Sequence, residues 1–298
     1  MRLPFVPGAL HTSERPSATA QWTALGRTLE LQRPFEQRIV SDEYAPVFLT
    51  KKTRAVAAPL KAAGPLVRLA ERGSELAPIS AFALCRHRFI DEHLLDALDR
   101  TDQVVVLGAG YDSRAYRFSA LLAGRAVYEV DLPPLSRRKA GIVASHPDVF
   151  GRTAVNRVEI DFRRQELGDV LTAAGFTRGA RTYIAWEGVS PYLSRAAVSA
   201  TLETLRDLCG PDSIVAMDFW DGIGGTGLLA PVRRLGAAAI GLVGEPVTFG
   251  MRPDTAVEFL DMHGATVVDL VQHSELAERY ATDGRKCEKS VYVLAARF

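Results

Sequence analysis

The second half of the chain alternates short apolar runs with longer stretches of helical periodicity. The runs are rich in β-branched residues, and the first five are separated by segments long enough for a helical crossover, which predicts a parallel sheet with helices on both faces. The last two follow each other after a short connection and predict a terminal antiparallel pair. The seven predicted strands are QVVVL (103–107), AVYEV (126–130), RVEI (157–160), TYIAW (182–186), SIVAMDF (213–219), ATVVDLV (265–271) and SVYVLAA (290–296).

The first hundred residues carry helical patterns, and no convincing strand precedes residue 103. Residues 17–33 place Trp22, Leu25 and Leu29 at helical spacing, with Ser17 able to cap the start and Pro34 expected to end the helix. Residues 42–73 read as helical pieces cut by prolines, and residues 79–99 form the clearest helix of this half. The prolines expected to cut the helices are Pro46, Pro59 and Pro65.

These patterns predict an α/β fold with a seven-stranded, Rossmann-like sheet. A helical N-terminal cap is expected over residues 1–100 and the core over 101–298. Residues 220–255 are too long for a plain crossover and contain GIGGTG and GEPVTFG, so we expect an inserted lid there.

Composition and charge exclude several classes of function. The formal net charge of the 298 residues is +1, so no overall field attracts nucleic acid or an anionic membrane. The three cysteines, Cys85, Cys209 and Cys287, lack metal-site or disulfide spacing and favour buried thiols in a reducing compartment. No apolar run approaches the ~20 residues of a membrane span, and the first residues do not read as a signal peptide. We expect a cytoplasmic protein with no metal site.

The stretch VVVLGAGYDSRAYRF (104–118) runs from a strand through a glycine-rich turn into a predicted helix. A dinucleotide fingerprint would have a third glycine where this chain has Ser113, and an acid about 20 residues on to bind a ribose. Glu129 and Asp131 both stand near that distance. Nicotinamide cofactors and S-adenosylmethionine each place a ribose there, so this acid does not discriminate between them.

Asp112 does discriminate, because it lies in the first turn after the second glycine. A carboxylate at that position would repel a pyrophosphate, which dinucleotide sites bind at a helix N-terminus. S-adenosylmethionine has no phosphate and presents a sulfonium, an ammonium and one carboxylate. The pattern therefore favours S-adenosylmethionine over a dinucleotide.

Arg86 is the candidate partner for the carboxylate of such a ligand. It shares a face of the 79–99 helix with Phe82 and Ile90, and that face is otherwise apolar. A guanidinium buried there needs an anion. The alternative is an internal pair with an acid such as Asp91 or Asp131.

Four ordered motifs carry a family resemblance: GAGYDSRAYRF, YEVDLPPLSRRK, EIDFRR and WEGVSPYLS. Together with PSATAQWTALGR, DEYA and GEPVTFGMRPD, they resemble the leucine carboxyl methyltransferase family over about residues 15–298. The similarity is closest to its bacterial branch of S-adenosylmethionine-dependent O-methyltransferases that act on small molecules, polyketides among them. The resemblance implies a class I methyltransferase fold with S-adenosyl-L-methionine as cofactor.

The resemblance also implies roles for individual residues. Arg86 matches the arginine that holds the cofactor carboxylate, and Asp131 matches the acid on the ribose hydroxyls. Asp161 and Phe162 match the pair at the adenine, although the family usually has Leu at position 162, and Ser113 stands where the family often has Thr. The implied cofactor-binding set is Arg86, Gly108, Ala109, Gly110, Asp131, Asp161, Phe162 and Glu187, with Glu187 near the amino group.

Structural roles remain open for the same residues. Asp131 could cap the next helix, Asp161 could pair with Arg163 or Arg164, and Glu187 could serve only to shape a turn. Arg114 and Arg117 are expected to be structural and to pair with Asp112 and other acids. His87 and His93 are expected to serve packing.

The function indicated is methyl transfer to a carboxylate or hydroxyl oxygen of a small molecule, such as a polyketide or another secondary metabolite. A carboxylate acceptor is ionised at pH 7 and needs no base, whereas a phenol or alcohol benefits from one. No residue is assigned as the base; Tyr192 is the candidate to line the acceptor pocket, with packing as its alternative. The other functions considered are a protein C-terminal carboxyl methyltransferase, an NAD(P)-dependent oxidoreductase, a non-catalytic protein of this fold and an enzyme that uses the sulfonium for another reaction. No nucleic-acid or membrane partner is expected, and the oligomeric state is not indicated.

Overall fold

A computed structural model describes residues 17–62, 77–162, 164–221 and 249–298 of the chain. Within these residues, one seven-stranded sheet has the strand order β3-β2-β1-β4-β5-β7-β6. The strands are β1 (Gln103–Leu107), β2 (Ala126–Asp131), β3 (Asn156–Glu159), β4 (Thr182–Trp186), β5 (Ile214–Trp220), β6 (Thr266–Gln272) and β7 (Val291–Arg297). Strands β1 to β5 pair in parallel, and β7 runs antiparallel between β5 and β6. The predicted class I methyltransferase sheet is confirmed, with each strand within one residue of its expected bounds.

Side-chain alternation along the buried strands gives the sheet two apolar faces. In β1, Val105 and Leu107 face one cluster of buried residues, while Val104 and Val106 face the other. Both faces are covered by helices, so a central strand can be apolar at every position. This explains why β1 and β4 are unbroken apolar runs in the sequence and are buried along their whole length.

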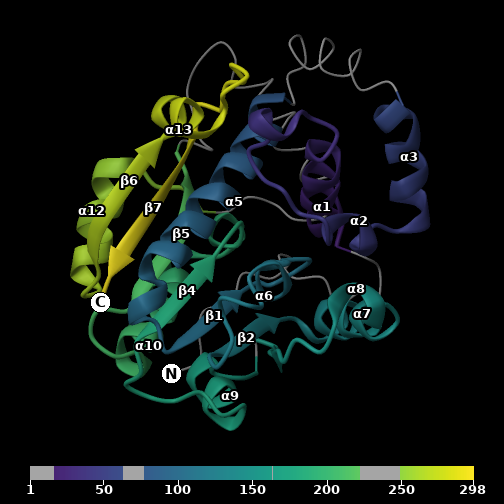
Figure 1. Ribbon diagram of the computed structural model, residues 1–298. Coiled ribbons are helices and arrows are strands. Elements are labelled where there is room, and N and C mark those ends of the chain that lie inside the picture. The colour runs from purple at the N-terminus through teal and green to yellow at the C-terminus, as the bar shows by residue number, and fades with distance from the viewer. Residues whose placement is uncertain (1–16, 63–76, 163, 222–248) are drawn as a thin grey trace.

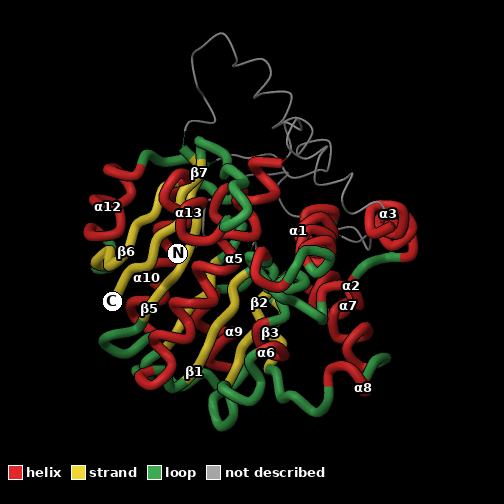
Figure 2. Tube along the Cα trace, turned by 45° about the horizontal axis from the view of Figure 1, so that its top comes forward, coloured by secondary structure: helices red, strands yellow, loops and turns green. Residues whose placement is uncertain are grey.

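Helices flank both faces and gather in a separate group beside β2 (Figure 1, Figure 2). One face packs against α9 (Leu167–Ala173), α10 (Arg195–Leu208) and α12 (Pro253–Met262), and the other against α5 (Ala77–Ala97), α6 (Arg114–Arg117) and α13 (His273–Tyr280). The group beside β2 includes α1 (Ala18–Glu30), α2 (Ala45–Phe48), α7 (Pro133–Ala144) and α8 (Pro147–Phe150), which share a third apolar cluster. This helix group therefore lies at the β3–β2 side of the sheet.

The N-terminal helices follow the sequence prediction with two corrections. Pro46 does not separate two helices, because it lies in the first turn of α2. Ser17 caps α1 as predicted, with its Oγ accepting from the N–H of Ala20 at 3.2 Å, and no strand precedes β1 among the described residues. Pro59, however, does not cut a helix, because it lies inside α3 (Lys51–Ala62). Ala55, whose carbonyl loses its helical donor to the proline, is exposed, so water can satisfy that carbonyl.

Other predictions fall partly or wholly outside the described residues. Most of the expected lid at 220–255 lies outside them, as does Pro65. No described helix combines the length and apolar character needed to cross a bilayer. The three cysteines are free thiols; Cys85 and Cys287 are buried, and a mutual hydrogen bond together with burial raises the pKa of Cys85.

Candidate functional site

The glycine turn after β1 is held close to the end of β2. The N–H groups of Gly108 and Ala109 both donate to the carbonyl of Val130, at 2.9 and 3.1 Å. Gly108 and Gly110 have φ angles of 65° and 42°, in the left-handed region that favours glycine. A Cβ on Gly108 would lie 2.2 Å from Cγ2 of Val189. Gly108 therefore allows Val189 to approach the turn, while Gly110 is required by its backbone conformation.

Asp131 faces this turn at the end of β2. Its Oδ2 accepts from the N–H of Gly110 at 2.5 Å, and its Oδ1 accepts from the N–H of Leu132 at 2.6 Å. Burial raises the pKa of Asp131 to about 6, even though the two N–H groups favour the ionised form. It is not the cap of α7, because that position belongs to Leu132. A carboxylate with both oxygens anchored on backbone presents a fixed pair of acceptors beside Gly110.

Glu129, the other acid of this strand, is used elsewhere. It is 3% exposed, and its Oε1 lies 2.8 Å from Nζ of Lys139, which is 2% exposed. Lys139 in turn lies over the ring of Phe48, 5.9 Å from the centroid. Glu129 is thus committed to a buried ion pair on the side of α7, so Asp131 is the acid of β2 that can serve a ligand at the turn.

Asp161 and Phe162 follow β3 and lie beside the end of β2. The N–H of Ile160 donates to the carbonyl of Asp131 at 3.0 Å, which places the segment after β3 next to the turn. Phe162 is partly buried against the apolar cluster on the α9 and α10 face. Arg164 Nε lies 3.8 Å from Asp161 Oδ2, as the structural alternative expected, but Arg164 is highly exposed, so the pair is weak.

Arg86 pairs with two acids, and neither is one that the sequence suggested. Its Nε donates to Glu187 Oε1 at 3.2 Å and its Nη1 to Asp218 Oδ2 at 3.0 Å, rather than to Asp91 or Asp131. Asp218 and Glu187 hold the pKa of Arg86 above its usual value against the effect of burial.

The third nitrogen of Arg86 lies beside Gly188. A Cβ on Gly188 would come within 3.0 Å of Nη2. The hydrogen bonds that Arg86 donates to described residues come from Nε and Nη1. Nη2 does not belong to the fully buried polar atoms that lack a hydrogen-bond partner. Nη2 is therefore the nitrogen of this guanidinium that the described residues leave without a hydrogen bond.

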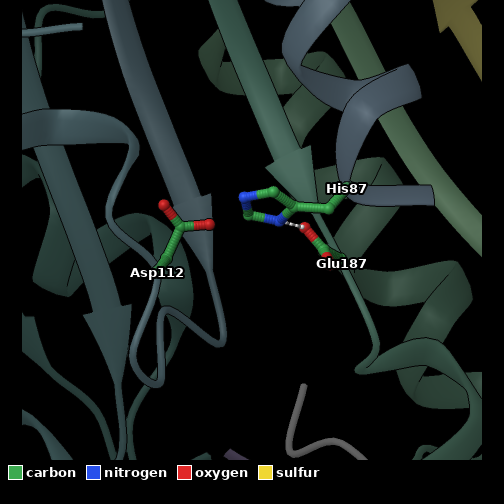
Figure 3. Close-up of side chains that lie close together, drawn as sticks. All are labelled: His87, Asp112 and Glu187. Carbon is green, nitrogen blue, oxygen red and sulfur yellow. Dashed lines mark hydrogen bonds and ion pairs between the residues drawn. The ribbon is translucent and has the colours of Figure 1, made fainter. Parts of the chain in front are cut away.

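Glu187, His87 and Asp112 come from three different elements and point toward one another (Figure 3). His87 Nδ1 lies 2.8 Å from Glu187 Oε2, and Arg117 Nη2 lies 2.7 Å from His87 Nε2. A guanidinium only donates and a carboxylate only accepts, so Nε2 must accept and Nδ1 must donate to Glu187, which puts the proton of the neutral ring on Nδ1. Arg114 Nη2 also lies 3.0 Å from Nδ1, but its protons are donated to Glu187 and to the carbonyl of His87. Burial and the Arg114 charge lower the pKa of His87, which keeps the ring neutral at pH 7.

Arg114 and Arg117 tie these acids together, as predicted. Arg114 is 1% exposed and donates to Asp91 Oδ1 at 2.7 Å, to Glu187 Oε2 at 2.7 Å and to Asp112. Arg117 donates to Asp91 at 2.7 and 3.0 Å. Although burial alone would raise it, the hydrogen bond from His87 and the charges of Arg114 and Arg86 hold the pKa of Glu187 well below its usual range. Glu187 therefore stays ionised.

The network as a whole has an excess of negative charge. Four carboxylates meet three guanidinium groups and a neutral imidazole, which leaves one negative charge uncompensated when all four acids are ionised. Burial raises the pKa of Asp218, one of these four acids. The carboxylates are Asp91, Asp112, Glu187 and Asp218, and the guanidinium groups belong to Arg86, Arg114 and Arg117. Such a site favours a ligand that brings net positive charge.

His87, Asp112 and Glu187 are side-chain types that bind metal ions, but their ligand atoms already take part in hydrogen bonds. Ligand atoms of His87, Asp112 and Glu187 lie within 4.8 Å of one another. Arg114 donates to both carboxylates and Arg117 to the imidazole Nε2. These guanidinium groups supply the positive charge that a cation would otherwise bring.

Sequence reasoning missed two members of the site. Asp218 is fully buried and accepts from the N–H of Gly188 at 2.6 Å as well as from Arg86. Its signal was a lone acid inside the apolar run SIVAMDF, since such an acid needs a buried partner. His87 was expected to serve packing, and its place one residue after Arg86 was the available signal. Tyr192 ends the short 3₁₀ helix Ser190–Tyr192 and adds a smaller contribution to the raised pKa of Arg86, which places it near Arg86.

Comparison with known proteins identifies the family of the chain. The family model described as "Leucine carboxyl methyltransferase" matches residues 20–206. A Rhodococcus jostii protein named "Putative S-adenosyl-L-methionine-dependent methyltransferase" is 35% identical over 208 residues, covering 67% of this chain and 64% of that protein. A Mycobacterium bovis protein of the same name is 32% identical over 208 residues, covering 69% and 65%. The matched stretch is thus a little under two thirds of these relatives' own length.

Two solved structures are similar to this chain over part of their length. An O-methyltransferase family protein from Burkholderia thailandensis has a TM-score of 0.46 at 13% identity, covering 94% of this chain and 69% of that one. The magnesium protoporphyrin IX methyltransferase of Synechocystis, solved with bound SAH, has a TM-score of 0.46 at 12% identity, covering 73% and 85%.

The family model covers well over half of the chain, and its extent includes the glycine turn, Arg86 and the Glu187 cluster. The resemblance indicated by the ordered motifs is therefore confirmed, and the protein belongs to the leucine carboxyl methyltransferase family.

Proposed function

We propose that the protein is an S-adenosyl-L-methionine-dependent O-methyltransferase that acts on a carboxylate or hydroxyl of a small molecule. The observation that carries the proposal is that two features lie together at the carboxyl ends of the parallel strands. Asp131 is anchored beside the glycine turn, and a buried network with one excess negative charge lies at the ends of β4 and β5. S-adenosylmethionine needs both a hydrogen-bond acceptor for its ribose hydroxyls and an environment that favours its net positive charge.

Each part of the cofactor has a candidate partner. Asp131 would accept from the ribose hydroxyls, and Asp161 with Phe162 would meet the adenine. Arg86 Nη2 would hold the carboxylate, while Glu187, kept ionised by its neighbours, would attract the ammonium. The backbone of Gly108, Ala109 and Gly110 would border the methionine part.

The glycine turn is poorly suited to a dinucleotide. A pyrophosphate uses free N–H groups at the start of a helix, but α6 has only four residues and the N–H of Arg114 already donates to Asp112 Oδ1 at 2.7 Å. The Asp112 carboxylate would also lie where the phosphates need positive charge. This supports a methyltransferase over an NAD(P)-dependent oxidoreductase.

Bound S-adenosylmethionine supplies a methyl group that is already activated on a sulfonium. The residues of this chain then have to orient the donor and align an acceptor oxygen, about 3 Å from the methyl, for direct displacement. A carboxylate acceptor needs no base at pH 7. We assign Tyr192 to the wall of the acceptor pocket and leave the reaction without a catalytic base among the described residues.

Further parts of the proposal rest on the sequence and the family. They are the cap at residues 1–100, the core at 101–298 with a lid at about 220–255, a cytoplasmic location and a role in secondary metabolism. The second candidate function is carboxyl methylation of a protein C-terminus, which the family description itself suggests. A peptide that ends in a free leucine carboxylate distinguishes it from small-molecule methylation.

Calorimetry with S-adenosylhomocysteine tests the cofactor site directly. The wild type should bind, Asp131→Asn should bind at least tenfold more weakly, and Glu159→Gln should bind like the wild type. Glu159 is the matched control because it receives the same change on the neighbouring strand β3, where it faces the exposed Arg137. Absence of binding by folded wild-type protein would overturn the proposal.

The acceptor is tested separately by mass spectrometry with S-adenosylmethionine and a panel of carboxylic acids and phenols. A gain of one CH₂ on a small molecule supports the proposal, and methylation of the leucine peptide alone supports the second candidate. Cofactor binding without methylation of any acceptor, while the sulfonium compound is consumed, would indicate a different reaction on the same fold.

A further inference from the structure

Arg27, on the cap helix α1, reaches the glycine turn of the core. Its Nη2 donates to the carbonyl of Tyr111 at 2.7 Å, and its Nε donates to Asp42 Oδ2 at 2.7 Å. Arg27 is 5% exposed and Asp42 is completely buried. The carbonyl of Tyr111 belongs to the residue directly after Gly110, so a helix of the cap binds the backbone of the turn.

Asp42 holds the other end of the same stretch. The hydroxyl of Ser113 donates to Asp42 Oδ2 at 2.7 Å, while Asp42 Oδ1 accepts from the N–H groups of Tyr44 and Ala45 at 3.0 and 3.1 Å. Asp42 thus fixes the start of α2 with one oxygen and the turn with the other. The Ser113 hydroxyl also accepts from Arg117 Nε at 3.0 Å, which continues the contact into the network around Glu187.

The first half of α1 lies directly over the turn. A Cβ on Gly110 would be 3.6 Å from the Cβ of Ala20, and Ala20 is one helical turn from the Ser17 cap. The ring of Tyr111 stacks on Phe48 of α2, with 5.3 Å between the centroids and 19° between the planes. Arg27, Asp42 and Phe48 therefore contact the stretch from Gly110 to Ser113, and Ala20 lies beside it.

We propose that Arg27 and Asp42 are positioning residues that hold the glycine turn in the shape that binds the cofactor. The proposal rests on the proposed function. The turn has two left-handed residues, and its helix α6 is too short to stabilise that shape by itself. Arg27 and Asp42 supply the missing constraint from outside, with one bond to the backbone after Gly110 and one to the side chain of Ser113.

The consequence is that cofactor binding depends on the docking of the cap. Loss of either bond lets residues 110–113 sample other conformations, and only the fraction in the binding shape accepts the cofactor. The dissociation rate should rise as well, because α1 covers the turn. The methyl-transfer step itself is not affected, since neither residue reaches the reacting atoms.

A second buried pair on the same helix offers a matched control. Arg285 donates to Glu30 at 2.7 and 2.8 Å and ties the end of α1 to the segment before β7, one helical turn beyond Arg27 and without a contact to the glycine turn. Glu30 retains Arg33 as a partner at 3.2 Å if Arg285 is removed. Arg285→Met therefore loosens α1 without touching residues 108–113.

The test compares Arg27→Met, Arg27→Lys and Arg285→Met in the full chain. S-adenosylhomocysteine affinity and dissociation rate are measured by calorimetry and stopped flow, and exchange of the amides in residues 108–114 by hydrogen–deuterium mass spectrometry. Arg27→Met should raise Kd and the dissociation rate at least tenfold and speed exchange at the turn. Arg27→Lys should be intermediate, because one ammonium cannot serve both Asp42 and Tyr111. Arg285→Met should lower Tm while leaving Kd within twofold.

The inference fails if folded Arg27→Met binds within twofold of the wild type, or if Arg285→Met weakens binding equally. Should Arg27→Met not fold, Arg27→Lys decides on the same measurements. If the wild type itself does not bind S-adenosylhomocysteine, the proposed function falls. In that case, hydrogen–deuterium exchange of the amides in residues 108–114 still tests whether Arg27 positions the turn. If Arg27→Lys exchanges these amides at the wild-type rates, the positioning role is overturned as well.

Discussion

Arg114 Nη2 lies 2.7 Å from Glu187 Oε2 and joins the helix after the glycine turn to the end of β4. The two residues are far apart in the sequence but belong to neighbouring strand ends, since β1 and β4 pair in parallel. The contact makes the two candidate halves of the cofactor site, the turn and the acid cluster, parts of one rigid unit. Mutations at Arg114 therefore test the unit as a whole.

Replacement of Arg114 should be strongly destabilising. Arg114→Met leaves Asp91, Asp112 and Glu187 buried with too little positive charge, and breaking a buried ion pair costs about 3–5 kcal/mol. Urea unfolding should show this loss in the free energy of unfolding. Arg137→Met, which removes an exposed partner of Glu159, is the control and should leave the midpoint unchanged; equal effects of the two changes would contradict the assignment.

The two glycines of the turn should differ in their tolerance of a methyl group. Gly108→Ala combines a left-handed φ with a clash against Val189, for a cost of about 2–4 kcal/mol. Gly110→Ala meets Ala20 only at ordinary contact distance and should cost about 1–2 kcal/mol. Thermal unfolding measures both, and Val189→Ala should recover part of the loss in Gly108→Ala but none in Gly110→Ala. Failure of that selective recovery would count against the steric explanation.

Asp131 should make cofactor binding pH-dependent. Burial raises its pKa from 3.8 to about 6, so the folded protein binds this proton more tightly than the unfolded chain does. The contribution of Asp131 to folding stability therefore falls as the pH rises from about 4 to 6.

Ligand binding should have the opposite dependence, because ribose hydroxyls need the ionised carboxylate. S-adenosylhomocysteine affinity should fall about tenfold from pH 7 to pH 5, roughly one unit below the pKa. Calorimetry across this range measures the trend. Asp131→Asn should bind weakly at every pH with little slope, and an unchanged slope in that variant would assign the titration to another group.

Arg86 should be intolerant even of lysine. A lysine can pair with Glu187 or Asp218, but it has no fork of donors to hold both acids and keep a third nitrogen for an external carboxylate. Arg86→Lys should weaken S-adenosylhomocysteine binding at least tenfold in calorimetry. Arg88→Lys on the same helix is the control, because Arg88 is exposed and pairs with Glu92. Loss of binding in both variants would point to damage to α5 rather than to a lost contact.

Much of the site could be predicted from the sequence, because its motifs lie at the ends of predicted strands. A glycine turn after an apolar run, followed by an acid at the end of the next run, places Gly110 and Asp131 together in any parallel sheet with adjacent strands. The choice of Asp131 over Glu129 came from the family resemblance, and the structure then shows Glu129 in an ion pair with Lys139. The roles of these residues toward a cofactor remain proposals.

Other contacts had no local signal. Arg86 was expected to meet Asp91 or Asp131, but its partners come from β4 and β5, which lie more than 100 residues away. Pro59 was expected to interrupt a helix, yet the exposed surface of α3 lets water replace the lost bond. His87 became part of the network only because α5 lies against the ends of the strands.

The sequence by itself determined the sheet, its strand bounds, the glycine turn and the family, because each depends on periodicity or on residues close together in the chain. Only the tertiary structure decided which charges meet. Pairing of buried charges depends on which strand ends and helices become neighbours, and a guanidinium can satisfy any acid within reach. Thus Arg27 on the cap, Arg86 on α5 and Asp218 on β5 acquire their roles from packing, where the exclusion of water makes each partner necessary.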